Sequence, residues 1–426
     1  MTTATITDFA EAARTVLRTN DRGGYTVPTA RLYPYQWNWD SAFCAMGFAT
    51  FDEARAWREI ERLLEGQWDD GLVPQIVFHQ SSPDYFPGPE LWGTSHTPPT
   101  SGITQPPVLA TAVRFVLERA GDRAAAQARV AAIYPRLAAW HRWWARARDP
   151  AGTGLVAIIH PWESGMDNSP AWDAAIARVP RTTRGTYQRR DTGFVDAAQR
   201  PRQDDYDRYM HMVERYRDAG WEPAKLWQAA PFKVADVSIN AILHRAETDL
   251  LALAARFGSA ADRDEIAARC ERRRAAFDAL WNGARALYQP LDLVAGTRID
   301  VCASSGFMPL FGGLADGARA GAMAAEMQRW ADGVRFAMPT VPADSPSFEP
   351  RRYWRGPVWA IVNWLLADGL ARAGEAAFAG RLRRDTLDLI ERHGFCEYFD
   401  PTDGSGLGGG TFSWTAAVWL IWSSGT

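Results

Sequence analysis

Apolar residues recur at intervals of three and four along most of the chain, which is the period of α-helices with one buried face. The clearest stripe predicts a helix that Gly258 ends, and it consists of Ile239, Ile242, Ala246, Leu250, Leu253 and Phe257. Similar stripes cover residues 57–64, 137–144 and 320–330, and Pro135 is expected in the first turn of the second. A further helix is expected from Thr104 to about Ala120. Because no segment shows clear strand-like alternation, we predict an all-α fold.

Short joints between the helical stripes carry an acidic residue that suits the start of the next helix. Asp52, Asp122, Asp316 and Glu375 stand at such joints. A negative side chain at a helix N-terminus meets unpaired N–H groups and the positive end of the helix dipole. Short joints bring consecutive helices together as antiparallel pairs. Helix pairs repeated over the whole chain predict an α/α toroid.

Long stretches between the helices lack a helical period and are rich in aromatic residues, proline and glycine. They span residues 25–39, 71–101, 158–202, 337–355 and 397–410. Because connections this long usually carry function, we expect them to gather at one end of the toroid and wall a pocket. No linker divides the chain, so we expect a single catalytic domain over residues 1–426. Residues 71–101 and 177–209 are the expected active-site loop or lid insertions.

Charge and short motifs exclude several classes of function. The 426 residues include 47 Lys+Arg and 50 Asp+Glu, and the net charge of -3 offers no electrostatic basis for binding nucleic acid or an anionic membrane. The start shows no signal-peptide pattern, no apolar stretch is long enough to span a bilayer, and the cysteines are scattered, which indicates a cytoplasmic protein. The histidines have no zinc-binding spacing, and the G-x-G-x-x-G match at 404–409 lies too near the end for a dinucleotide-binding unit. We therefore expect no cofactor and no metal, while a homo-oligomer remains open.

Carboxylates within aromatic loops are the strongest functional signal. They occur in YPYQWNWDS at 33–41, HPWESGMDNSP at 160–170 and GFCEYFD at 394–400, and a related ring cluster is YWRGPVW at 353–359. Aromatic faces stack on the C–H surfaces of sugars, while carboxylates bind hydroxyls or transfer protons. Each segment alone also suits a helix cap, a turn or core aromatics. Their combination favours a sugar site, in which some of the 20 tryptophans would stack on the sugar and exclude water.

The same segments, together with the closing GFCEYFDPTDGSGLGGGTFSWTAA, resemble the inverting α-glycosidases with an (α/α)6 toroid. The chain is most similar to glycoside hydrolase family 63, in its bacterial branch of glucosylglycerate and mannosylglycerate hydrolases. The resemblance implies that Asp167 is the general acid and Glu397 the general base. It implies glycone contacts from Tyr33, Trp37, Asp40, Gln105, Trp162, Tyr353, Trp354 and Trp359, and glycerate contacts from Arg200, Tyr206 and Tyr85.

We therefore expect an enzyme that hydrolyses a small α-glucoside or α-mannoside with inversion. The expected substrate is glucosylglycerate or mannosylglycerate. Inverting enzymes hold their two carboxyl groups about 6.5–9.5 Å apart, which leaves room for a water molecule. Thr411, near which relatives carry a bulkier residue such as glutamine, and the arginine-rich residues 177–198 leave the aglycone open. Arg200 is also compatible with a solvated loop position. The alternatives are a neutral-oligosaccharide α-glucosidase or trehalase-like hydrolase, and a non-catalytic sugar-binding toroid.

Overall fold

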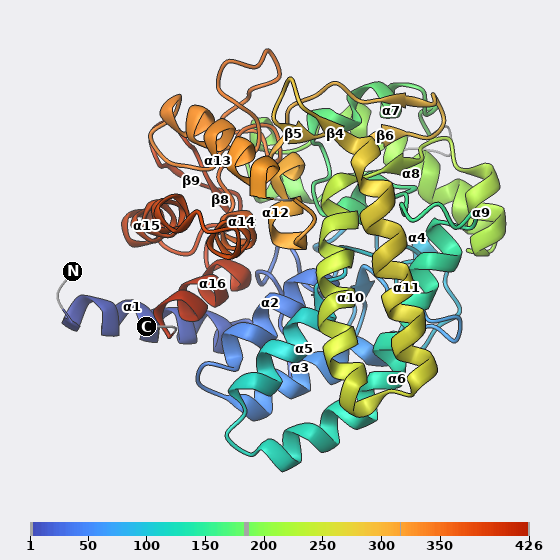
Figure 1. Ribbon diagram of the computed structural model, residues 1–426, viewed down its shortest axis with the longest axis horizontal. Coiled ribbons are helices and arrows are strands. Elements are labelled where there is room, and N and C mark those ends of the chain that lie inside the picture. Colours follow the sequence, from blue (N-terminus) through green and yellow to red (C-terminus); the bar gives the residue numbers. More distant parts are fainter. Residues whose placement is uncertain (1–2, 183–186, 316, 425–426) are drawn as a thin grey trace.

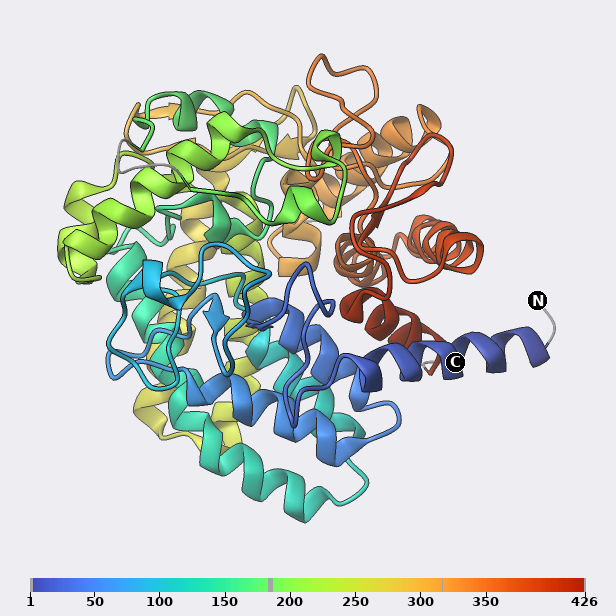
Figure 2. The same cartoon turned by 180° about the vertical axis from the view of Figure 1, so that it is seen from behind.

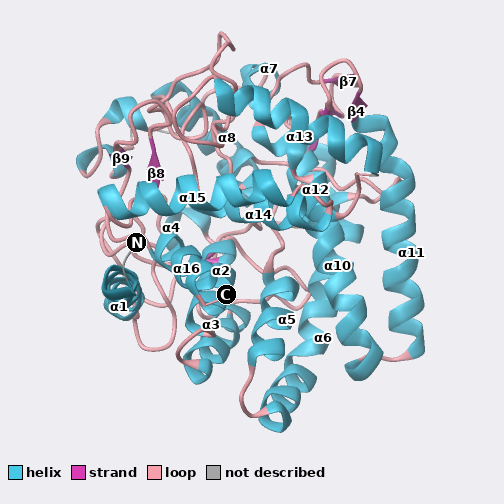
Figure 3. Ribbon diagram, turned by 60° about the vertical axis from the view of Figure 1, so that its left-hand side comes forward, coloured by secondary structure: helices cyan, strands magenta, loops and turns pink. Residues whose placement is uncertain are grey.

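The computed structural model describes residues 3–182, 187–315 and 317–424, and six of its helices form a closed inner ring (Figure 1). These are α2 (Asn38–Phe48), α5 (Leu109–Arg119), α10 (Val237–Phe257), α12 (Pro309–Gly312), α14 (Ala360–Arg372) and α16 (Ser413–Ser423). Each helix contacts the next one in this order, and α16 contacts α2, which closes the ring. Helices dominate the structure and the strands are short (Figure 3). The expected toroid is confirmed.

An outer helix alternates with each inner helix along the chain. The outer helices are α1 (Thr3–Thr19), α3 (Glu53–Glu65), α6 (Arg123–Arg148), α11 (Ala260–Phe277), α13 (Gly317–Asp332) and α15 (Ala376–His393). The contacts α2–α3, α5–α6, α10–α11 and α14–α15 are the predicted pairs of consecutive helices, and α1 packs on α16. In α13, Trp330 meets the ring of Phe307 edge-on at 4.9 Å.

Burial explains which helices are inner and which are outer. Every residue of α2 is buried, and α16 is buried from Ser413 to Ile421, because other helices surround them. In α3 the predicted stripe of Trp57, Ile60 and Leu64 is buried, whereas its charged residues mostly face outward. A helix that is apolar all round belongs inside, and an amphipathic one belongs on the rim.

The position expected for Pro135 is wrong, since this residue lies inside α6 rather than in a first turn. The helix begins at Arg123 because the Asp122 carboxylate caps it, accepting the N–H of Ala125 at 3.0 Å. Val130 and Leu137, on either side of the proline, are both buried. Continuous packing of this face thus outweighs the backbone hydrogen bond that proline cannot make.

The helix start expected at Thr104 also differs from the structure. The helix expected from Thr104 begins only at Leu109, because each proline of the pair at 106–107 disfavours helical geometry in the residue before it. Helix α2 begins at Asn38, so Asp40 lies in its first turn and is not its cap. Asp52 does cap α3, and its carboxylate accepts the N–H of Arg55.

The two other acidic residues expected at helix starts are Glu375 and Asp316. Glu375 directly precedes α15 but makes no side-chain cap bond, and Asp316 lies outside the described residues. Within the described chain, no helix combines the length and the apolar character needed to cross a bilayer.

Short elements and loops gather over one face of the toroid, which Figure 2 shows. The helices outside the two rings are the short α4 (Pro89–Trp92), α7 (Asp173–Ala177) and α9 (Pro223–Ala229) and the longer α8 (Gln203–Asp218). Antiparallel pairing joins β1 (Gln36–Trp37) to β2 (Ile76–Val77), β4 (Trp281–Asn282) to β5 (Leu287–Tyr288), and β8 (Tyr398–Phe399) to β9 (Gly406–Leu407). A three-stranded sheet has the order β3 (Val234–Ala235), β6 (Leu291–Asp292), β7 (Thr297–Arg298).

Candidate active site

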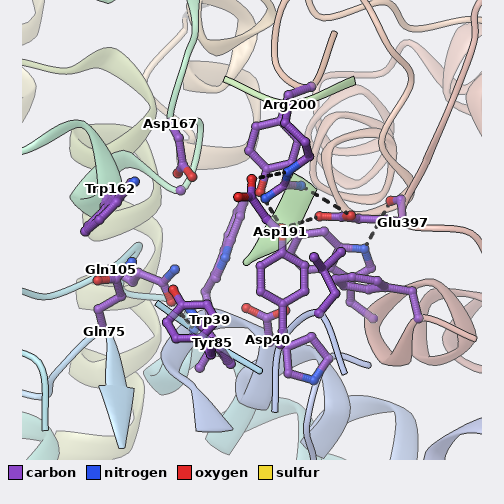
Figure 4. A pocket seen from close by; sticks show the side chains of 18 of the residues that line it. Trp39, Asp40, Gln75, Tyr85, Gln105, Trp162, Asp167, Asp191, Arg200 and Glu397 are labelled. Atoms are coloured by element: carbon purple, nitrogen blue, oxygen red, sulfur yellow. Dashed lines mark hydrogen bonds and ion pairs between the residues drawn. The ribbon is translucent and has the colours of Figure 1, made fainter. Parts of the chain in front are cut away.

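A pocket on this face is lined by residues from all of the long loop stretches, as the sequence predicted (Figure 4). It brings together most of the expected site residues: Tyr33, Trp37, Asp40, Tyr85, Gln105, Trp162, Asp167, Arg200, Tyr206, Tyr353 and Glu397. In Figure 4, Asp167 and Glu397 lie on opposite sides of the pocket, and Asp40 lies below them.

Asp167 follows a tight turn that begins in the 3-10 helix Pro161–Ser164. The Ser164 hydroxyl donates to the carbonyl of Pro161 and accepts the N–H of Met166, which folds the turn back on itself. Gly165 is required there, because its φ is +69° and a Cβ atom would lie 2.7 Å from the ring of Trp39. The turn thus presents the Asp167 side chain to the pocket.

Apart from its own backbone N–H, the Asp167 carboxyl has no hydrogen-bond or ion-pair partner among the described residues, and the Tyr209 hydroxyl donates to the Asp167 backbone carbonyl at 2.8 Å. Burial raises the pKa of Asp167 to about 7, a rise that Arg200 opposes and Glu397 supports. At neutral pH a large fraction of this group is therefore protonated. A protonated carboxyl that faces a pocket is suited to donate its proton.

Glu397 is fully buried and has several donors around its carboxylate. The Tyr33 hydroxyl donates to Oε1 at 2.9 Å and the Gly409 N–H donates to Oε2 at 3.3 Å. Arg200 Nη1 lies 3.7 Å from Oε2. Burial raises the pKa of Glu397, while Arg200, Tyr33 and Gly409 oppose that rise. These donors favour the ionised form, which is the form that accepts a proton.

The hairpin of β8 and β9 holds Glu397 in place and requires a glycine beside it. Gly408 has a φ of +69°, and a Cβ atom at this position would lie 2.3 Å from Glu397 Oε2. The glycine run near the C-terminus therefore serves the close approach of backbone and carboxylate.

Arg200 is 2% exposed and lies between two carboxylates. Its Nε donates to Asp191 Oδ2 at 3.1 Å, and its guanidinium carbon lies 4.2 Å from the ring centre of Tyr353. Arg189 Nη2 also donates to Asp191 Oδ2, at 2.6 Å. Burial alone would raise the pKa of Asp191, but Arg200 and Arg189 outweigh it and hold that pKa below its usual range. Arg200 Nη1 is buried without a hydrogen bond to any described residue.

The lower part of the pocket carries polar groups between aromatic rings. Asp40 is 4% exposed, and burial raises its pKa well above the ordinary value. The Trp39 N–H donates to Gln105 Oε1 at 3.4 Å, and the Tyr33 and Tyr353 hydroxyls lie 3.0 Å apart. Tyr353 has a φ of 44°, a left-handed conformation that is unusual for a residue other than glycine. Aromatic rings and hydrogen-bonding groups in one enclosed space match a sugar, which has C–H surfaces as well as hydroxyl groups.

Two of the expected glycone residues do not line the pocket. Trp354 and Trp359 stack on each other behind it, with ring centroids 3.7 Å apart. The Trp359 indole N–H donates to the carbonyl of Tyr353 at 3.2 Å. Their position supports the lining residue Tyr353 from behind.

Other lining residues were absent from the expected set: Pro28, Leu32, Trp39, Gln75, Phe86, Gly165, Asp191, Phe412 and Trp414. Trp39 and Gly165 stand inside the aromatic motifs and were accessible to sequence reasoning. Asp191 lies in the arginine-rich segment, where no motif marks it. Among the described residues, no group of three or more His, Cys, Asp or Glu side chains is arranged to hold a metal ion.

A closed ring of paired helices, with two carboxyl groups in different environments within one aromatic pocket, is the arrangement of a glycoside hydrolase of the (α/α)6 class. The Mannosylglycerate hydrolase MGH1-like glycoside hydrolase domain matches residues 33–415, and the chain belongs to this family. The resemblance seen in the sequence is thereby confirmed.

Named relatives cover nearly the whole chain. Mannosylglycerate hydrolase MGH1 of Selaginella moellendorffii is 51% identical over 97% of this chain and 85% of its own length. Glucosylglycerate hydrolase of Mycolicibacterium hassiacum is 37% identical over 98% of each chain. The crystal structure of the GH63 mannosylglycerate hydrolase from Thermus thermophilus in complex with Tris and D-glycerate is 50% identical, with a TM-score of 0.95 over 97% of this chain and 100% of that chain.

Proposed function

We propose that this enzyme hydrolyses α-mannosylglycerate, and also α-glucosylglycerate, to the hexose and glycerate. The buried Arg200 supports an acidic leaving group, because its Nη1 lacks a hydrogen-bond partner among the described residues and lies in the pocket beside the base. The glycerate carboxylate is a natural partner for such a cation. The relatives of about 50% identity are mannosylglycerate hydrolases, which places mannose first.

In the proposed reaction, Asp167 is the general acid and Glu397 the general base. Asp167 gives its proton to the glycosidic oxygen while the bond between that oxygen and C1 breaks. A water molecule attacks C1 from the opposite face and gives a proton to Glu397. The hexose leaves with inverted configuration, and proton exchange with solvent resets both carboxyl groups.

The remaining lining residues take the two ends of the substrate. Tyr33, Trp37, Asp40, Gln105 and Trp162 bind the hexose, with ring faces on its C–H surface and polar groups on its hydroxyls. The glycerate lies toward Arg200, Tyr206 and Tyr85.

The described parts of the insertions at 71–101 and 177–209 form a lid over the pocket of a single catalytic domain, and residues 183–186 of the second insertion lie outside the described residues. They meet where Phe86 stacks on Tyr187, with ring centroids 4.9 Å apart. Both insertions contribute lining residues, among them Tyr85 and Arg200. Contact between them closes the glycerate end of the pocket against water.

A substrate panel tests this function together with the Arg200→Ala variant. Mannosylglycerate, glucosylglycerate, maltose and trehalose are incubated with each protein, and free hexose is measured. Loss of a charge-assisted hydrogen bond costs about 1.5–3 kcal/mol, so kcat/KM on the glycerate substrates should fall about ten- to hundred-fold. Arg202→Ala is the matched control, because Arg202 pairs with Glu349 on an exposed surface.

Activity on neutral disaccharides alone would remove glycerate from the proposal and favour an α-glucosidase or a trehalase-like enzyme. Equal losses on acidic and neutral substrates would show that Arg200 only supports the fold.

A further inference from the structure

Glu163 is a fully buried carboxylate that lies in sequence between the lining residues Trp162 and Gly165 but does not line the pocket itself. Its partner is Arg148, the last residue of α6, which is 1% exposed. Arg148 Nη2 donates to Glu163 Oε1 at 2.5 Å, and Arg148 Nε lies 3.2 Å from both carboxylate oxygens. The cation thus holds the carboxylate with a forked contact, which fixes its orientation as well as its position.

The same carboxylate joins two other segments to this ion pair. Glu163 Oε2 accepts the N–H of Ile159 at 2.8 Å, and Oε1 accepts the N–H of Thr104 at 3.5 Å. The first bond anchors the start of the segment that leads to Asp167. The second anchors the residue before Gln105, whose side chain lines the pocket. One buried group therefore ties the acid-bearing turn and the Gln105 loop to the end of an outer helix.

Glu163 is not itself a candidate for proton transfer. It is 0% exposed, and both of its oxygens already accept hydrogen bonds from Arg148 and from the backbone. Its influence on the reaction must pass through the residues that it fixes.

We propose that Glu163, locked by Arg148, is a positioning residue that sets where the Asp167 carboxyl meets the glycosidic oxygen. The proposal rests on the assignment of Asp167 as the general acid. A displacement of about 1 Å in a reacting group costs about 10²-fold in rate, so the anchoring of this turn matters to catalysis.

Two substrates with different leaving groups separate positioning of the acid from general structural support. Without protonation, glycerate would have to leave as an alkoxide, so its departure needs the proton of the acid. Fluoride, leaving from α-mannosyl fluoride, is the conjugate base of a much stronger acid and needs little protonation. A defect in the acid therefore lowers kcat on mannosylglycerate far more than on the fluoride.

Glu163→Gln should lower kcat on mannosylglycerate about 10²-fold and affect the fluoride much less. This variant leaves Arg148 buried without its counter-charge, so its Tm should fall. The double variant Glu163→Gln/Arg148→Met removes both charges. It should regain Tm while keeping the unequal loss of kcat.

Glu247→Gln is the matched control, because Glu247 is equally buried and pairs with Arg269 and Arg273 between α10 and α11, where no residue lines the pocket. It should lower Tm without changing the ratio of the two kcat values. The positioning role would be overturned if Glu163→Gln lowered kcat equally on both substrates, or if the double variant fully recovered kcat.

Asp167→Asn distinguishes failure of this inference from failure of the proposed function. A strong preference of Asp167→Asn for the fluoride, without one in Glu163→Gln, refutes the positioning role alone. If Asp167→Asn shows no such preference, the assignment of the general acid is wrong, and the proposal for Glu163 falls with it.

Discussion

Asp167 and Glu397, the proposed acid and base, differ in their neighbours more than in their chemistry. Glu397 accepts hydrogen bonds from Tyr33 and Gly409, with Arg200 nearby, while the carboxyl of Asp167 has no such donor among the described residues. Burial raises the pKa of both groups, but Glu397 accepts hydrogen bonds from two other residues that favour its charge, whereas Asp167 is favoured only by the charge of Arg200 and by its own backbone N–H. Different surroundings of this kind give two carboxyl groups of one site different pKa values, so that one can donate a proton while the other accepts one.

Asp167→Asn should stabilise the folded protein above neutral pH. The folded-state pKa of about 7 lies above the ordinary 3.8, so Asp167 contributes stability fully below about pH 4 and loses it as pH rises through 7. Asparagine carries no charge to bury, so the free energy of unfolding at pH 8 should rise by roughly 1–4 kcal/mol. Thermal unfolding of both proteins from pH 4 to 8 measures this. A Tm difference that does not grow across that range would contradict the raised pKa.

At the scale of elements, the hairpin of β8 and β9 connects the base to the 177–209 insertion. Gln199 Oε1 accepts the N–H of Gly408 at 3.0 Å, and the Tyr398 hydroxyl donates to the carbonyl of Gln199 at 2.8 Å. The hairpin therefore holds Glu397 on one side and the segment of Arg200 on the other. Its backbone geometry bears directly on the position of the base.

Gly408→Ala should lower kcat by at least about 10²-fold, since the new methyl group would overlap Glu397 Oε2 and displace the carboxylate. Gly410→Ala is the matched control in the same loop, because a Cβ atom there meets nothing within 4 Å. Steady-state kinetics on mannosylglycerate compares the two. Equal activity of both variants would show that the hairpin does not position the base.

Helices and loops could be predicted where a local sequence pattern determines them, but not where packing against distant residues does. The 3.6-residue period revealed the helices, and aromatic loops with carboxylates revealed the pocket. The helical path through Pro135 was missed, since burial of Val130 and Leu137 on both sides decides it. Asp191 was missed because its role comes from Arg189 and Arg200, which only the folded loop brings together.

At the scale of the molecule, closure of the ring relates residues that are far apart in the chain. The contact of α16 with α2 brings the C-terminal Glu397 loop next to the N-terminal Tyr33 loop, and Tyr33 donates to Glu397. Asp167 comes from the long connection between α6 and α10 and lines the same pocket. The ring thus sets the separation of Asp167 and Glu397, the proposed acid and base, on which the stereochemistry of the proposed reaction depends.

Proton NMR of the first product formed from α-mannosylglycerate tests the central claim most directly. Spectra are recorded before mutarotation, with wild-type enzyme at a concentration that completes the reaction within minutes. Inversion gives β-mannose as the first product, and we expect no turnover by Asp167→Asn or Glu397→Gln. α-Mannose as the first product would contradict it, because retention requires a covalent intermediate on one of these carboxyl groups.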